Sequence, residues 1–127
     1  MKPGKTGIGR LLDATRYSKR GLAAAFRHEA AFRQETLLVA VLFTASFWLQ
    51  TSIVEWLLLV GPLFILLIVE LVNSGIETVV DRIGSERHEL SGRAKDMGSA
   101  AVFLSLLLIA VTWGTVIWGR FVASAAG

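Results

Sequence analysis

The stretch IVELVNSGIETVVD, residues 68–81, places acidic and amide side chains at the end of a strongly apolar run. It directly follows WLLLVGPLFILL, residues 56–67, which is apolar enough to lie in a membrane. A carboxylate near the bilayer centre costs about 2.5–3.5 kcal/mol on insertion scales. The placement of Glu70, Asn73 and Glu77 in such surroundings therefore calls for a reason.

If this stretch is helical, its polar residues form one stripe. At about 3.6 residues per turn, positions 70, 73, 77 and 81 fall on one helix face, and they hold Glu, Asn, Glu and Asp. Such a stripe must face a partner, water or an ion rather than lipid. A salt-bridge network that holds helices together, a functional site, and a proton or ion pathway are all compatible with this spacing.

Three long apolar segments account for the high hydrophobicity of the chain. Of its 127 residues, 54% are hydrophobic, and the mean hydropathy is +0.59. The apolar residues concentrate in residues 37–49, 56–72 and 97–119. Because about 20 apolar residues cross the hydrocarbon core of a bilayer, we expect an all-α membrane protein with three transmembrane helices.

The bounds of the predicted helices follow from these segments and their flanks. We expect one domain, residues 1–127, with transmembrane helices over about 29–49, 52–83 and 97–118. The second helix is longer than a membrane requires, so its last turns are expected to project into the cytoplasm. The basic segment 1–28 carries apolar residues near one face and is expected to form an amphipathic helix on the membrane surface.

The remaining segments give weaker signals. Glycine and serine punctuate residues 82–96, RIGSERHELSGRAKD, and this predicts a loop with one helical turn. Small residues recur every seven positions in the third helix and predict a packing seam; they are Gly98, Ser105, Thr112 and Gly119. Tryptophans near the outer ends of the spans predict an aromatic belt; they are Trp48, Trp56, Trp113 and Trp118.

The distribution of basic residues predicts the topology. Eight of the thirteen Lys and Arg residues lie in residues 1–36, four lie in 82–95, and none lies in 50–55. By the positive-inside rule, the N-terminus and the 82–95 segment are cytoplasmic, and the C-terminus lies outside. Nucleic-acid binding would explain the basic residues but not three hydrophobic spans, so we expect no nucleic-acid partner.

The residue types in the stripe favour particular chemistry. The chain has no cysteine, which excludes disulfides, thiolate metal sites and a cysteine nucleophile. Oxygen ligands without histidine clusters suit Mg²⁺ or Mn²⁺, and Mg²⁺ near basic residues suits a nucleoside triphosphate. Neither a Walker A loop nor a protein-kinase signature is present, so any nucleotide would bind on another scaffold.

A small channel or transporter is the alternative from another class. It would require the polar stripe to continue across the membrane. Between Trp56 and Val69 the second helix is apolar apart from Gly61 and Pro62. No polar path therefore crosses the membrane on that helix.

Three stretches resemble the prokaryotic diacylglycerol kinase family: EAAFRQE from Glu29, VELVNSGIETVVDRIGSE from Val69, and HELSGRAKDMGSAAV from His88. The resemblance covers essentially the whole chain. It implies a small enzyme of the bacterial cytoplasmic (inner) membrane that transfers phosphate from ATP to diacylglycerol and gives phosphatidate and ADP. It also implies a homotrimer whose sites lie between subunits, near the membrane surface. Some relatives phosphorylate undecaprenol, so a polyprenol kinase is the alternative within the family.

The resemblance also implies roles for individual residues. Glu70 matches the catalytic base, and Glu29 and Glu77 match the carboxylates that hold Mg²⁺. The positions that match the nucleotide site are Arg10, Tyr17, Glu29, Asn73, Glu77, Glu86, Arg87, His88, Lys95 and Asp96. The positions that match the lipid side are Arg10, Glu35, Trp56, Glu70 and Ser99.

The predicted topology can be tested by labelling. Cysteines introduced at Ser85 and at Ala125 should react with a membrane-impermeant thiol reagent from opposite sides of the membrane, because three crossings separate the N-terminus from the C-terminus. The native chain has no cysteine, so each variant reports one site. Labelling of both positions from the same side would contradict the three-span topology.

Overall fold

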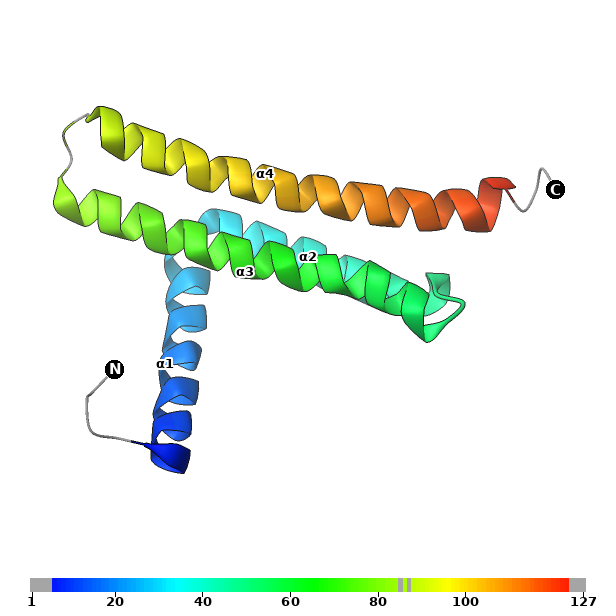
Figure 1. Cartoon of the computed structure of the whole chain (residues 1–127), viewed down its shortest axis with the longest axis horizontal. Coiled ribbons are helices and arrows are strands. Elements are labelled where there is room, and N and C mark those ends of the chain that lie inside the picture. Colours follow the sequence, from blue (N-terminus) through cyan, green and yellow to red (C-terminus); the bar gives the residue numbers. More distant parts are fainter. Residues whose placement is uncertain (1–5, 85, 87, 124–127) are drawn as a thin grey trace.

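The computed structural model of the chain describes residues 6–84, 86 and 88–123. All regular structure in this part of the chain is helical (Figure 1). Its elements in chain order are α1 (Gly7–His28), α2 (Ala30–Leu49), α3 (Ile53–Ile83), α4 (Glu89–Ile117) and a short π-helix (Trp118–Ala123). Three of these helical segments, α2, α3 and α4 with its π-helical end, are long and apolar enough to cross a membrane. The prediction of an all-α protein with three such helices is confirmed.

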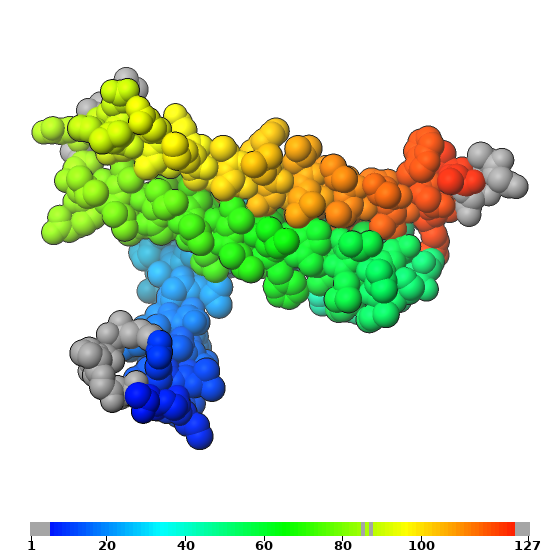
Figure 2. Space-filling view, in the orientation of Figure 1, coloured from blue at the N-terminus to red at the C-terminus, as the bar shows by residue number. Residues whose placement is uncertain are grey.

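The helix α3 is the central element of the fold. It packs along α4 and along α2, and the three helices lie side by side (Figure 1). The helix α1 runs crosswise to them and contacts α2 and α3. In the space-filling view, α1 projects from the side of the three-helix body (Figure 2). This crosswise orientation is the one that a helix on a membrane surface requires.

The core lies between α3 and α4. Leu59, Leu63 and Leu66 are completely buried and follow the i, i+4, i+7 spacing of one helix face. They pack against Ile109 and Trp113 of α4. The indole Nε1 of Trp113 donates a hydrogen bond of 2.9 Å to the carbonyl of Leu59, because a buried indole N–H needs an acceptor.

Trp113 therefore does not belong to the predicted aromatic belt, and that part of the prediction is wrong. Trp48 and Trp118 are exposed, as residues of a belt would be. Trp56 is half-buried, and its Nε1 donates to Oγ of Ser46 at 3.1 Å.

The start of α3 is fixed by a side-chain cap. Ser52 precedes the helix, and its Oγ accepts a hydrogen bond of 3.1 Å from the amide of Glu55. The carboxylate of Glu55 accepts in return from the amide of Thr51 at 3.0 Å. Such reciprocal contacts satisfy amides that a helix start leaves unpaired. From this cap α3 continues through Pro62 for 31 residues, or about 46 Å, which exceeds the roughly 30 Å of a hydrocarbon core.

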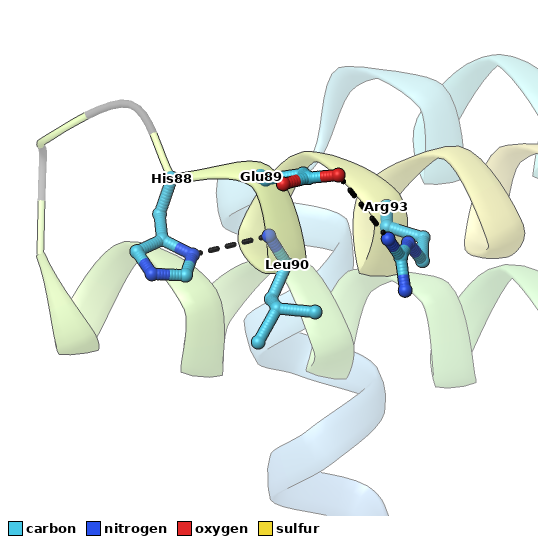
Figure 3. Close-up of polar contacts among 4 residues, drawn as sticks. All are labelled: His88, Glu89, Leu90 and Arg93. Carbon is cyan, nitrogen blue, oxygen red and sulfur yellow. Dashed lines mark hydrogen bonds and ion pairs between the residues drawn. The ribbon is translucent and has the colours of Figure 1, made fainter.

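The helix α4 begins earlier than the sequence predicts. Residues 89–96 were expected in a loop, but they form its first turns. His88 caps the helix because its Nδ1 accepts from the amide of Leu90 at 3.1 Å, and Glu89 pairs with Arg93 at 3.3 Å (Figure 3). These contacts offset Gly92, since a glycine in a helix costs only about 1 kcal/mol.

The predicted packing seam of small residues is buried only in the N-terminal half of α4. Gly98 and Ser105 are buried, whereas Thr112 is half-buried and Gly119 is exposed in the π-helix. Beyond Ser105, the larger Ile109 and Trp113 fill the contact with α3. The helices therefore approach through small residues only where Gly98 meets the polar stripe.

The corner between α1 and α2 is held by one arginine. Nη1 of Arg33 donates to the carbonyls of Phe26 and Arg27, at 2.8 and 3.1 Å. These carbonyls belong to the last turn of α1, where a cation is favourable. Glu29 is the only residue between the two helices and has extended backbone dihedrals. The position of α1 therefore fixes the place of Glu29.

Much of the apolar surface of the spans is uncovered. Large side chains on α3 and α4 are more than half exposed, including Phe64, Val72 and Phe103. Exposed apolar patches of this extent are not found on soluble monomers. Lipid or other subunits must cover them.

Candidate active site

The predicted polar stripe lies at the inner side of α3 and becomes more exposed toward the helix end. Glu70 and Asn73 are 3% and 7% exposed. Glu77 is half-buried, and Asp81 is exposed. The stripe therefore runs from the interior of the helix bundle to solvent, so a polar ligand could reach its inner end from the Asp81 end.

Glu70 lies beside one other carboxylate, and two more carboxylates lie farther off. The Glu35 carboxyl, on α2, lies within hydrogen-bonding reach of Glu70, and Glu77 and Glu29 are close enough to act on it electrostatically. We call Glu29, Glu35, Glu70 and Glu77 the carboxylate cluster. Its members come from α2, α3 and the corner between α1 and α2. Like charges held together in this way repel one another unless a cation or a proton lies between them.

A lysine lies at the solvent end of the carboxylate cluster. Nζ of Lys95, on α4, donates to Oδ1 of Asp81 at 2.8 Å, and its charge also acts on Glu77. The early start of α4 places Lys95 on a helix rather than in a loop. An ammonium group therefore stands beside the carboxylates, where it could contact an anionic ligand.

A groove of about 720 Å³ separates α1 from α3 beside the cluster, which is a typical volume for a ligand pocket. Its polar lining comes from both helices and from the corner between them, and comprises Ser18, His28, Glu29, Ser74 and Thr78. Ser74 is 6% exposed, and its Oγ has no hydrogen-bond partner among the described residues.

Ser74 was not among the predicted site residues. It follows Glu70 by four positions and precedes Thr78 by four. The helical spacing that identified the stripe could therefore have identified Ser74 as well. Ser74 thus borders the stripe on the side of α1, and Asn73, within the stripe, meets Gly98 of α4.

Several predicted site residues lie apart from the cluster within one chain. Arg10 and Tyr17 are exposed on α1, and Arg10 is separated from Glu29 by about 28 Å of helix. Trp56 lies about 21 Å from Glu70 along α3. Ser99 is exposed on α4.

The other predicted nucleotide positions lie near the turn between α3 and α4. Glu86 and His88 line a shallow pocket of about 560 Å³, and Asp96 is exposed on α4. Arg87 lies outside the described residues. The turn is at the same end of the molecule as Asp81 and Lys95.

The described carboxylates do not form a complete metal site by themselves. Among the described residues there is no group of three or more Asp, Glu, His or Cys side chains that could hold a metal ion alone. Mg²⁺ usually binds through one or two carboxylates together with substrate phosphates and water. Glu29 and Glu77 therefore fit a cation that arrives with a nucleotide.

Three apolar helices, a crosswise basic helix and a buried carboxylate cluster define a membrane protein with a polar site at its helix junction. The family model for prokaryotic diacylglycerol kinase matches residues 16–117. The chain therefore belongs to the prokaryotic diacylglycerol kinase family, as the sequence resemblance indicated, and it is a kinase and a bacterial membrane protein.

Curated relatives match over almost their whole length. The chain is 53% identical to a diacylglycerol kinase of Pseudomonas aeruginosa over 91% of this chain and 94% of that protein. It is 47% identical to that of Escherichia coli, over 95% and 99%. It is 46% identical to that of Haemophilus influenzae, over 89% and 96%.

The repulsion within the cluster predicts a stabilising substitution. In the absence of divalent cations, Glu77→Gln should raise the free energy of unfolding by less than the roughly 0.5 kcal/mol of adjacent like-charge pairs on helices, because Glu77 lies about two turns from Glu70 and the charge of Lys95 also acts on it. The measurement is thermal unfolding in detergent micelles with EDTA. Adding Mg²⁺ and a non-hydrolysable ATP analogue should stabilise the wild type more than the variant.

Glu86→Gln is the matched control for the measurement in EDTA, where no nucleotide is bound, because Glu86 is exposed in the turn and is not among the residues that act on Glu70. It should leave the stability in EDTA unchanged. Equal stabilisation of the wild type and Glu77→Gln by Mg²⁺ and nucleotide would contradict a metal role for Glu77.

Proposed function

We propose that the protein phosphorylates the primary hydroxyl of diacylglycerol with ATP and yields phosphatidate and ADP. The observation that supports this most directly is the burial of Glu70 beside Glu35, with a basic residue and further carboxylates toward solvent. This order suits a lipid hydroxyl that stays in the membrane and a nucleotide that arrives from water. The relatives named above carry the same activity in their names.

Glu70 acts as the general base in this proposal. The hydroxyl oxygen of the lipid attacks the γ-phosphorus, the bond from that phosphorus to the β–γ bridging oxygen breaks, and the hydroxyl proton passes to the Glu70 carboxylate. Along α3, Glu70 lies about 10 Å deeper than Glu77. That separation leaves room for the γ-phosphate between the two carboxylates.

Glu35 and the groove serve the lipid. Oε2 of Glu35 is buried without a hydrogen-bond partner among the described residues, so it could take up the hydroxyl proton from Glu70 and carry it onward. The groove between α1 and α3 carries mostly apolar walls, including Leu22, Ala25 and Leu71. Such walls can hold the glycerol and the first part of an acyl chain.

The nucleotide binds at the solvent end of the stripe in this proposal. Lys95 is held beside Glu77 by Asp81 and would exchange part of that contact for the phosphates. Glu29 and Glu77 would hold Mg²⁺ with the phosphates, and this cation offsets charge that develops on the transferred group. Glu86, His88 and the turn would contact the adenosine.

We propose that the sites are completed in a homotrimer. Arg10 is about 28 Å of helix away from Glu29 of its own chain, and the apolar faces of α3 and α4 are exposed. A neighbouring chain would cover these faces and bring its own residues to the site. The N-terminus and the α3–α4 turn face the cytoplasm, where ATP is present, and α1 lies on the cytoplasmic (inner) membrane surface.

The proposed activity is tested by phosphoryl transfer. Purified protein in mixed micelles should transfer the labelled γ-phosphate of ATP to diacylglycerol, and Glu70→Gln should lower kcat by at least about 100-fold, because general acid–base catalysis contributes about 10²–10⁴-fold. The affinity for ATP and the thermal unfolding midpoint should stay near those of the wild type.

Two further arms make this test decisive. Undecaprenol in place of diacylglycerol identifies a polyprenol kinase if it is the better acceptor. Glu55→Gln is the matched control, because Glu55 lies at the opposite end of α3, and it should retain turnover. A Glu70→Gln enzyme near the wild-type rate would eliminate the base assignment, whereas loss of folding with full activity per folded molecule would favour a structural role.

Shared sites predict recovery of activity in mixed oligomers. Glu70→Gln and Asp96→Asn chains should each be inactive alone. If Glu70 and Asp96 of one site come from different chains, some sites in a mixture receive both intact residues, and part of the wild-type activity returns. Mixing must be verified by two affinity tags on one oligomer. Inactivity of a verified mixture would count against sites shared between chains.

A further inference from the structure

Gly98 lies where α4 meets the polar stripe of α3. The ten glycines of the described residues differ in the space around each missing side chain. A Cβ at eight of them would meet nothing within 4 Å, and at Gly84 it would make one ordinary contact of 3.9 Å. At Gly98 it would lie 3.0 Å from Cγ of Asn73 and still closer to Oδ1 of the same side chain. The contact of α4 with Asn73 therefore requires a glycine.

Asn73 is held in this contact without a hydrogen bond to its oxygen. The residue is 7% exposed, and among the described residues its Oδ1 has no hydrogen-bond partner. A buried unpaired acceptor is unfavourable, so its orientation must be imposed by the surroundings. Gly98 of α4 faces this side chain, because a Cβ on Gly98 would meet Oδ1 of Asn73 first. Because Oδ1 is turned toward α4, the donor Nδ2 of the same amide is turned away from it.

We infer that Gly98 is a positioning residue for Asn73. The missing side chain lets the carboxamide rest against α4 and fixes the direction in which its donor points. This inference rests on the proposed function and on the family resemblance, in which Asn73 matches a position of the nucleotide site. The atoms that a Cβ on Gly98 would meet first are the end of the Asn73 side chain, not backbone. Gly98→Ala should therefore keep the helix packing but turn the amide.

The orientation of Asn73 can be followed directly. Asn73 is the only asparagine in the sequence, so protein labelled with ¹⁵N in the asparagine side chain gives one pair of NH₂ resonances. Gly98→Ala should shift this pair, and Gly114→Ala should not, because a Cβ on Gly114 of the same helix meets nothing within 4 Å. Unchanged resonances in Gly98→Ala would overturn the inference.

Kinetics supply the second readout. Turnover in Gly98→Ala should fall about ten-fold or more, the scale of a lost hydrogen bond to a charged group, and should match that of Asn73→Ala. The double variant Asn73→Ala/Gly98→Ala should be no slower than Asn73→Ala alone, because both changes act through one side chain. Fully additive losses would overturn the inference.

The outcomes separate this inference from the proposed function. Shifted resonances with wild-type turnover in both single variants would support the positioning by Gly98 and remove the role of Asn73. Slow turnover in Asn73→Ala, together with wild-type resonances and wild-type turnover in Gly98→Ala, would keep the role of Asn73 and overturn the positioning by Gly98. If Gly98→Ala does not assemble, the double variant should, since only Cβ of Asn73 remains, at 3.7 Å; failure of both would overturn the inference.

Discussion

The burial of Glu70 on an otherwise apolar helix is the constraint on which the rest of the structure depends. A carboxylate that is 3% exposed cannot face lipid at an acceptable cost. Glu35 of α2 lies beside Glu70, and Glu29 and Glu77 act on it electrostatically. The arrangement is electrostatically unfavourable by itself, and in our proposal a bound cation or substrate reduces this repulsion.

Three contacts between helices hold the surroundings of Glu70 in place. The core around Leu63 and Trp113 joins α3 to α4. The hydrogen bonds from Arg33 to the last turn of α1 join α1 to α2, and the Lys95–Asp81 ion pair joins the solvent ends of α3 and α4. These contacts enclose the cluster from three directions. A fourth direction is left to a neighbouring chain in our proposal, because one chain leaves much of its apolar surface exposed.

The sequence predicted α2 and α3 closely because their limits coincide with changes that the sequence displays. Leu49 ends an apolar run, and Ser52 with Glu55 forms a recognisable helix start. The start of α4 was missed because its cap is a histidine, which is rarely found in that position, and because Gly92 indicated a loop.

The sequence predicted which residues of α3 belong to the candidate site, but not which residues of the other helices contact them. Periodicity along α3 identified Glu70, Asn73 and Glu77, because helical spacing is a local property. The contacts with Glu35, Lys95 and Gly98 depend on how helices pack, and sequence spacing carries no such information. Trp113 illustrates the same limit: its indole is held by the Leu59 carbonyl, and only the packed structure places that acceptor beside it.

The length of α2 has a consequence for how the protein responds to its membrane. At 20 residues, or about 30 Å, α2 matches the hydrocarbon thickness, whereas α3 and α4 exceed it. Its inner end carries Glu29 and the Arg33 cap, and its outer end is tied through the Leu49 carbonyl to Arg120 at 2.6 Å. The length of α2 therefore sets the distance between these two ends, one at each face of the bilayer. In our proposal, a thinner or thicker membrane would displace the Glu29 corner relative to the lipid headgroups and would change the depth at which lipid and nucleotide meet.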